Sequence, residues 1–237
     1  MAPAGTSSYD DHPHPGITGR VTEMADLTRA VRRLIAATVL NRAPARSVAE
    51  IAAGLHTLAD RLERHIPDPP PPVTNMTRTA TNGAAAVSAG GDAMAENMAY
   101  DVVIGPYSPL AVPVSITFDP PKAIGRARFS LPYEGPPGCV HGAVIAATFD
   151  IVLTAANIVG GAAGPTVSLT TRYLRPTLLH EEASFEAWVD RTEGRRVFTR
   201  GRLVQRGATT VEAEGTFALI DHSRTRRLGE ERRSSGR

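Results

Sequence analysis

The chain has 237 residues, enough for one large domain or for one ordinary domain with an extension. Hydrophobic residues make up 42% and aromatic residues 5%, so a core must be built mainly from aliphatic side chains. The net charge of +2 is uneven: residues 222–237 hold six Arg and two Glu, which leaves residues 1–221 at −2 and excludes a basic nucleic-acid-binding body. The single cysteine, Cys139, excludes an internal disulfide and a multi-cysteine metal site.

The two ends of the chain have the composition of solvated segments. Residues 1–20 are rich in Pro, Gly, Ser and His and have no apolar stretch after a basic start, so we expect a disordered N-terminus without a secretory signal. We interpret His12 and His14 as part of that tail, and we expect no metal or other cofactor. Residues 222–237 predict an Arg-rich tail in water. A cytoplasmic location is the resulting expectation.

Residues 21–66 have the apolar spacing of two helices that form a hairpin. Apolar or small residues recur every three or four positions, at Leu27, Val31, Leu34 and Thr38 and then at Val48, Ile51, Leu55, Leu58 and Leu62. Ser47 and Glu50 have the spacing of a capping box at the start of the second helix. The pattern favours a role in packing or oligomer support, with binding of a partner as the alternative.

Residues 67–105 have little periodicity and begin with a run of prolines, so we predict a linker or a mobile cover. From residue 106 the pattern changes to one of strands. Alternating or apolar runs predict strands at 115–118, 123–131, 166–174, 183–190, 196–205 and 209–220, with a helix over 141–159 after the second strand. Because a helix that is apolar on all sides must be covered on all sides, we expect an antiparallel sheet wrapped around it, which is an α+β fold.

One carboxylate stands within the long apolar run. Between Gly135 and Thr171, Asp150 is the only formally charged residue. The stretch from Gly142 to Gly164 is long enough to span a membrane, but a central Asp costs about 2.5–3.5 kcal/mol there and no aromatic belt flanks it. We therefore predict a buried helix and no transmembrane segment. An unpaired Asp in such a helix is a functional candidate, and capping of a neighbouring loop is the alternative.

The turn before this helix suits a developing negative charge. Residues 138–142, with the sequence GCVHG, lead into the helix N-terminus, where free amides and the helix dipole favour an oxyanion. Gly142 and Asp150 are eight positions apart, which is roughly 12 Å along a helix. One substrate carbonyl cannot contact both in one chain. If both act on one substrate, two antiparallel helices at a two-fold axis are required, and the sequence favours an obligate dimer with composite sites.

Two segments resemble a known family. Residues 133–150, YEGPPGCVHGAVIAATFD, and 165–176, PTVSLTTRYLRP, resemble the hotdog-fold acyl-CoA thioesterases of the phenylacetate-degradation (PaaI-like) and thioesterase-superfamily-member type. The resemblance covers residues 106–221, half of the chain, and implies a hotdog fold. It also implies that Gly142 supplies an oxyanion amide, that Asp150 is the general base or nucleophile, and that Thr166 orients the water or the carboxylate.

The remaining candidates concern substrate binding. His141 is interpreted mainly as stabilising the turn, and Ala143 departs from the family's usual His-Gly-Gly by adding a methyl group where chains and ligand crowd. A second departure is Gly135, where some relatives have an Asn that positions water. Arg195 and Arg196 could meet CoA phosphates, because guanidinium groups match phosphate geometry, or they could be solvated charges at strand ends.

We therefore predict an acyl-CoA thioesterase that acts as a homodimer, possibly a homotetramer, on an acyl-CoA substrate and without nucleic acid. The alternative is an acyl-CoA-binding hotdog protein with weak or no catalysis. A hotdog dehydratase acting on a hydroxyacyl thioester is a weaker third hypothesis, because the spacing of Asp150 from His141 fits hydrolysis better. The proposed domains are an N-terminus (1–20), a helical hairpin (21–66), a Pro-rich linker (67–105), the hotdog unit (106–221) and the tail (222–237).

Overall fold

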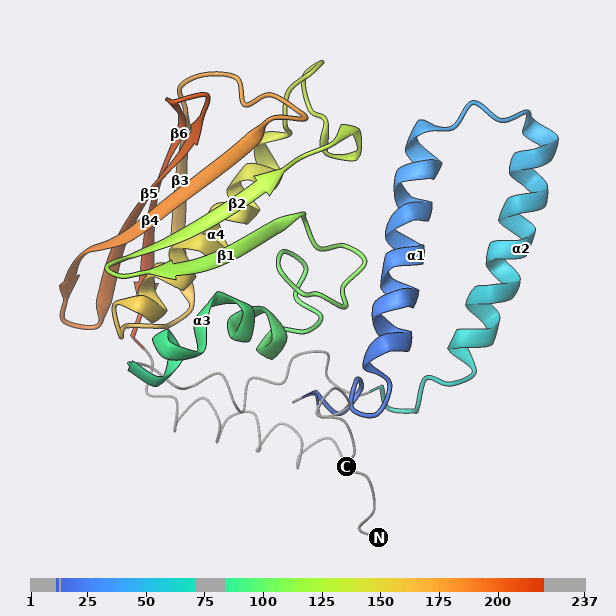
Figure 1. Cartoon of the computed structure of the whole chain (residues 1–237), viewed down its shortest axis with the longest axis horizontal. Coiled ribbons are helices and arrows are strands. Elements are labelled where there is room, and N and C mark those ends of the chain that lie inside the picture. The colour runs from blue at the N-terminus through green and yellow to red at the C-terminus, as the bar shows by residue number, and fades with distance from the viewer. Residues whose placement is uncertain (1–11, 13, 71–83, 220–237) are drawn as a thin grey trace, which may run out of the picture.

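A six-stranded antiparallel sheet forms the body of the protein (Figure 1). The computed structural model describes residues 12, 14–70 and 84–219. The strands lie in the order β1-β2-β4-β5-β6-β3, with bounds β1 (Val114–Asp119), β2 (Lys122–Arg128), β3 (Thr166–Tyr173), β4 (Glu182–Glu193), β5 (Arg196–Gln205) and β6 (Ala208–Ala218). Gly194 and Gly207 have φ angles of 57° and 76° in the two tight turns that join β4, β5 and β6, where glycine adopts positive φ without strain. All six strands match the predicted runs.

Helix α4 (Gly142–Val159) lies inside the curve of this sheet (Figure 1). Its buried side chains, among them Ile145, Phe149 and Leu153, form the core with the inward residues of the strands. Phe149 packs edge-to-face on Phe185 of β4, with ring centroids 5.0 Å apart. A sheet wrapped around one long central helix is the hotdog fold, so the predicted fold class is confirmed.

Helix α4 is less covered than the sequence suggested. Gly142, Ala147 and Asp150 are partly exposed and Ala143 is exposed, so one stripe of the helix is open in the single chain. The expectation of cover on every side is therefore wrong for this stripe. Among the described residues, α4 is the helix whose length and composition would suit a membrane span, but half of that window is buried within the fold.

The segment expected to be a linker is structured where it is described. Helix α3 (Ala84–Asn97), interrupted at Gly90, packs beside β1 and places Met94 in the core. A Cβ on Gly91 would lie 2.0 Å from the Ile116 carbonyl oxygen, so only glycine allows α3 to approach β1 so closely. Sequence periodicity missed α3 because its sequence is mostly Ala and Gly, without an apolar stripe. Residues 71–83 lie outside the described part of the chain.

The expected disorder of residues 1–20 is also wrong where the structure describes them. His12 is buried and its Nε2 lies 2.7 Å from Glu96 Oε2, while the buried His14 ring packs edge-on against Tyr100. Thus residues 12 and 14–20 are fixed to the body next to α3. Residues 1–11 and 13, like the predicted tail at 222–237, lie outside the described residues. The proposed domain boundaries stay a prediction.

Helices α1 (Val21–Leu40) and α2 (Ala45–Glu63) form at the predicted hairpin. The body holds α1 through Thr28 Oγ1, which donates to the Tyr107 carbonyl at 3.1 Å, and through Arg32, which donates to the Ser108 carbonyl at 2.7 Å. A short 3-10 helix, η1 (Leu131–Tyr133), also contacts α1. The capping box is not formed: α2 begins directly after Pro44, which leaves Ser47 inside the first turn.

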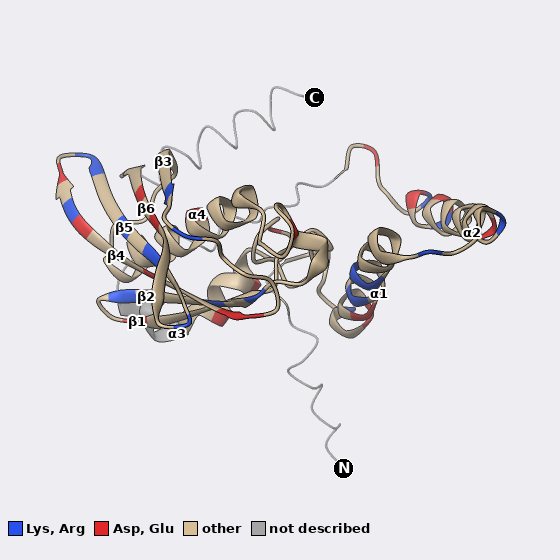
Figure 2. Ribbon diagram, turned by 90° about the horizontal axis from the view of Figure 1, so that it is seen from above, with Lys and Arg blue, Asp and Glu red and all other residues tan. Residues whose placement is uncertain are grey.

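Charged residues recur along the strands of the sheet (Figure 2). Lys122 of β2 and Arg202 of β5 lie 3.1 Å and 2.9 Å from Glu186 Oε2 on the strand between them. Burial by itself raises the pKa of Glu186, but hydrogen bonds from Lys122 and Arg202 outweigh it and hold that pKa below its ordinary value. The cluster therefore favours the ionised carboxylate in the folded state.

This cluster predicts a pH-dependent contribution to stability. Because the folded pKa of Glu186 is lowered, its stabilisation is present above about pH 4.5, the ordinary value, and disappears as the pH falls through the folded pKa. Wild type is expected to exceed Glu186→Gln in free energy of unfolding at pH 7, with the difference shrinking below pH 4. Urea unfolding of both proteins across this range measures it, and a difference independent of pH would contradict the assignment.

Candidate active site

Asp150 and Thr166 meet at the open stripe of α4. Thr166 Oγ1, on the first residue of β3, donates a hydrogen bond to Asp150 Oδ1 at 2.7 Å. Among the described residues, no hydrogen bond is recorded to Asp150 Oδ2. The carboxylate is partly exposed, so the expectation of a buried, unpaired Asp is wrong: it has one fixed partner and one free oxygen.

The connection between α4 and β3 explains this geometry. Gly161, with φ of 70°, ends the turn after α4, and Gly164 then passes so close to β6 that a Cβ would lie 1.8 Å from the Ala218 carbonyl oxygen. The chain therefore returns beside the helix and β3 begins level with Asp150. The predicted helix stop at these glycines has a second role, which is to place Thr166.

The N-terminus of α4 is shaped by the turn before it. The His141 N–H donates to the Tyr133 carbonyl at 2.8 Å, and the Gly138 N–H donates to Glu134 Oε1 at 2.7 Å. His141 is the N-cap: its Nδ1 accepts from the Ala143 N–H at 3.0 Å. This bond occupies the Ala143 amide, whereas within the described residues no acceptor is recorded for the Gly142 N–H. Gly142 therefore presents the free amide at this helix end.

Tyr173 is a site residue that the sequence analysis missed. Its hydroxyl, at the far end of β3, donates to the Gly142 carbonyl at 2.7 Å. A Cβ on Gly142 would lie 3.2 Å from this ring, which is a tight contact. The bond ties the edge strand to the start of α4. This contact becomes visible only when β3 is aligned along α4, because Tyr173 is 31 positions from Gly142 and no local sequence pattern marks it.

The two arginines proposed for CoA phosphates lie apart from these contacts. Arg195 and Arg196 are exposed in and next to the β4–β5 turn, and Arg196 is in register with Ala218, whose N–H donates to the Pro165 carbonyl. They thus lie at the end of the sheet where Thr166 starts β3, with β6 between β5 and β3. The structure brings Asp150 and Thr166 into contact, but it does not join either arginine to them.

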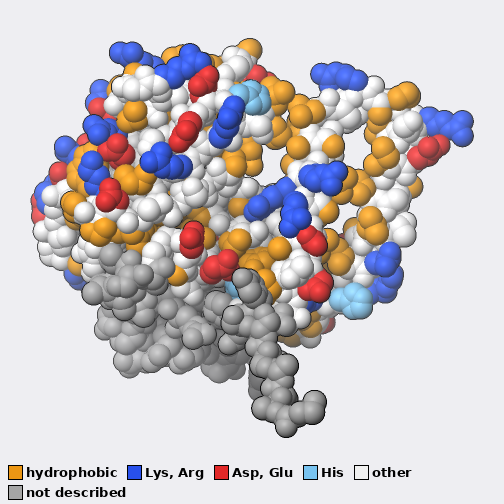
Figure 3. All heavy atoms as spheres, in the orientation of Figure 1, with side chains coloured by type: hydrophobic (Ala, Val, Ile, Leu, Met, Phe, Trp, Pro, Cys, Tyr) orange, Lys and Arg blue, Asp and Glu red, His pale blue; other side chains and the backbone are white. Residues whose placement is uncertain are grey.

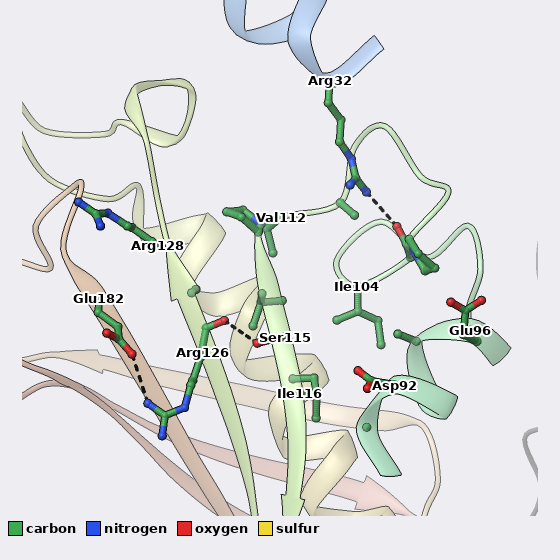
Figure 4. Close-up of a pocket in the computed structure, with 18 residues that line it drawn as sticks. Arg32, Asp92, Glu96, Ile104, Val112, Ser115, Ile116, Arg126, Arg128 and Glu182 are labelled. Atoms are coloured by element: carbon green, nitrogen blue, oxygen red, sulfur yellow. Dashed lines mark hydrogen bonds and ion pairs between the residues drawn. The ribbon is translucent and has the colours of Figure 1, made fainter. Parts of the chain in front are cut away.

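A separate pocket lies at the opposite edge of the sheet. It has a volume of about 660 Å³ and is lined by α3, the loop at 104–113 and strands β1 and β2 (Figure 4). Most of its charged groups already have partners: Arg126 pairs with Glu182, Glu96 pairs with His12, and Arg32 donates to backbone carbonyls. Asp150, Thr166 and Gly142 do not line it. Among the described residues, no cluster of His, Cys, Asp and Glu could hold a metal ion.

Comparison with known proteins places the chain in a family. The family model for the thioesterase superfamily matches residues 137–212. The crystal structure of a thioesterase superfamily protein designated RHA08564 is 32% identical and matches 82% of this chain and 94% of that chain, with a TM-score of 0.68. The chain belongs to the thioesterase superfamily. Within the superfamily match lie Gly142, Asp150 and Thr166.

Other solved structures with a similar fold have lower sequence identity to this thioesterase-superfamily protein. The PaaI protein of the phenylacetic acid degradation operon of E. coli is 17% identical over 45% of this chain and 79% of that chain, with a TM-score of 0.42. The smu.793 protein of Streptococcus mutans, solved with acetyl CoA bound, is 14% identical over 45% of this chain and 88% of that chain, with a TM-score of 0.43.

Proposed function

We propose that this thioesterase-superfamily protein is a cytoplasmic acyl-CoA thioesterase, which converts an acyl-CoA and water to a carboxylic acid and CoA. The observation that carries the proposal is the Asp150 carboxylate, held by Thr166 and open on its second oxygen. Membership of the thioesterase superfamily suggests thioester hydrolysis as the reaction. The Asp150 carboxylate is a group that can act as its general base or nucleophile. Release of CoA thiol from a panel of acyl-CoAs by the purified protein tests the proposal.

The chemistry follows from the positions of these groups. Asp150 Oδ2 accepts a proton from a water molecule, whose oxygen attacks the thioester carbon. The carbonyl oxygen becomes negative and is stabilised by the Gly142 N–H at the positive end of the α4 dipole. The C–S bond then breaks, and the CoA sulfur leaves with the proton. Direct attack by Asp150 to give an acyl anhydride is the alternative route, and the carboxylate is open to both.

A homodimer explains how Asp150 and Gly142 reach one substrate. Within the described residues, strand β3 is an edge strand that pairs only with β6. Val167 and Tyr173 on it are 62% and 51% exposed, and Leu174, directly after it, is 46% exposed. Such an edge is a template for another strand. Thr166 lies beside Asp150 at one end of β3 and Tyr173 lies beside Gly142 at the other. Antiparallel pairing of two β3 strands therefore brings the Gly142 of one copy towards the Asp150 of the other.

Thr166 is expected to act by orienting the carboxylate. Thr166→Val removes the hydroxyl but keeps the branched shape, so kcat should fall about ten- to a hundred-fold, the worth of a hydrogen bond to a charged group. Thr166→Ser retains the donor and is expected to stay close to the wild-type rate. Steady-state kinetics of both variants measure the effect. A loss in the Ser variant, with the Val variant at the wild-type rate, would show that the methyl group, and not the hydroxyl, matters.

An acyl-CoA-binding protein with little turnover is the second candidate. The observation that favours it is Ala143, which is exposed at the helix N-terminus with its amide occupied by His141. One amide fewer is then available for the oxyanion, and a methyl group stands beside Gly142. Saturable binding of an acyl-CoA without release of CoA would establish this candidate in place of the thioesterase.

A further inference from the structure

Helix α2 carries an apolar stripe that no other described part of the chain covers. No residue of α2 is buried, and the stripe is formed by five aliphatic residues, four of them 45–56% exposed: Val48, Ile51, Leu55, Leu58 and Leu62. Most surface helices bury such a stripe against their own domain. Because a helix of this length has little stability of its own in water, the stripe needs a cover.

Helix α1 adds a second open stripe. Thr28 and Arg32 point to the body, whereas Leu27, Val31 and Leu34 lie on another side of the helix, with Leu27 and Leu34 36% and 38% exposed. The two helices make almost no contact with each other. Figure 3 shows open space between them with all side chains drawn, bordered by apolar side chains. We call residues 21–63 the arm, because they project from the sheet and helix α4 (Figure 1).

The spacing of the stripes indicates that another helix covers them. On α2 the intervals are three, four, three and four residues, and on α1 Leu27, Val31 and Leu34 follow at four and three. This is the spacing of the seam between packed helices. Ala52, Gly54 and Ala59 flank the α2 seam, and such small residues let a second backbone approach closely. The arm thus has the features of half of a helical bundle.

The charges favour a second copy of this chain over a nucleic acid or an anionic membrane. Helix α2 carries Arg46 and Arg61 against Glu50, Asp60 and Glu63, so it has no basic face for phosphate. A surface with both signs is complementary to itself, as a two-fold contact requires. The match to RHA08564 spans 82% of the chain, whereas residues 106–221 make up about half, so the similarity extends into the N-terminal half.

We propose that the arms of two copies pair with each other through these stripes to form a four-helix bundle. This contact is separate from the β3 edge, because neither helix of the arm packs against β3. The chain then associates through two surfaces, one that completes the catalytic site and one that uses the arm. The arm contact does not depend on the proposed hydrolysis, so the two proposals can fail independently.

Sedimentation of the full chain over a range of concentrations tests the pairing. Leu55→Glu combined with Leu58→Glu places two charges in the seam and is expected to raise the dissociation constant of one association step at least tenfold. The control is Ala53→Glu, which adds the same charge on the opposite, exposed side of α2 and should associate like wild type. Leu55→Ala with Leu58→Ala keeps helix propensity and should shift association in the same direction, by less.

The opposite results are equally defined. The pairing would be overturned if both double variants keep their α-helical circular dichroism and still associate as strongly as wild type. A second result would also overturn the pairing. If the double variants associate like wild type but no longer bind phosphatidylglycerol–phosphatidylcholine vesicles that wild type binds, the stripe is a lipid-binding surface. Rates of CoA release, measured in parallel, report on the active site alone.

Discussion

Asp150→Asn is expected to lower kcat for acyl-CoA hydrolysis by about 10²- to 10⁴-fold, the range that a positioned general base contributes. Asn has nearly the same shape, and its side-chain oxygen can still accept the hydrogen bond that Thr166 donates at 2.7 Å. The change therefore removes the charge and the basicity of the free oxygen with little effect on structure. Release of CoA thiol, followed in both proteins with the best substrate of the panel, measures the loss.

A matched control separates chemistry from surface charge. Asp190→Asn removes a carboxylate from the outer face of β4, where it pairs with Arg191 and Arg200, and it should leave kcat within a few-fold of wild type. A rate for Asp150→Asn equal to that of wild type would remove Asp150 from the mechanism. Undiminished binding of acyl-CoA by the inactive variant would locate the effect in the chemical step.

The same residue allows the two routes to be distinguished. In water enriched in oxygen-18, general-base catalysis transfers the label only to the carboxylic acid product. Attack by Asp150 passes through an anhydride, and hydrolysis at the aspartyl carbon leaves the label in the protein. The mass of the peptide that contains Asp150, measured after turnover, reports this difference. Because Thr166 donates its hydrogen bond to Oδ1, Oδ2 is the oxygen positioned to attack.

The strands and α4 could be predicted because their patterns are strong and local. Alternation along 209–220 and the apolar run after Gly142 both correspond to elements of the structure. Helix α3 could not be predicted, since its position depends on a contact between Gly91 and the backbone of β1, which no periodicity encodes. The ordering of His12 and His14 was missed for a similar reason, because it depends on Glu96 and Tyr100, far away in sequence.

The candidate site could be predicted in part. Asp150 and Gly142 stand out in sequence as a lone charge and a helix start, and Thr166 came from the family resemblance. Tyr173 did not stand out, because its partner is a backbone carbonyl brought near by the packing of β3 on α4. The exposure of Asp150 was misjudged as well: composition shows that a helix is apolar but not which of its stripes the same chain leaves open.

Phe185→Ala is expected to be the most destabilising single change in the core, at about 3–5 kcal/mol, the usual cost of truncating a buried Phe. Phe185 is fully buried on β4, with the rings of Phe149 and Phe129 edge-on at centroid distances of 5.0 Å and 6.5 Å. Its removal would leave a cavity between the sheet and α4 and take an aromatic partner from both rings. Since domains have about 5–15 kcal/mol of stability in total, this variant should fold marginally or fail to fold.

Phe198→Ala on the neighbouring strand is the matched control. Phe198 is only partly buried on the outer face of β5, where the Arg191 guanidinium lies 4.0 Å from its ring centroid. Loss of that contact should cost about 1 kcal/mol, the range of exposed cation–π pairs. Urea unfolding of both variants at one protein concentration gives the comparison, because association stabilises the folded state by mass action. If the two changes lower the free energy of unfolding equally, the contact between α4 and β4 is not the centre of the core. Other contacts of α4 would then have to fix the position of Asp150 relative to β3.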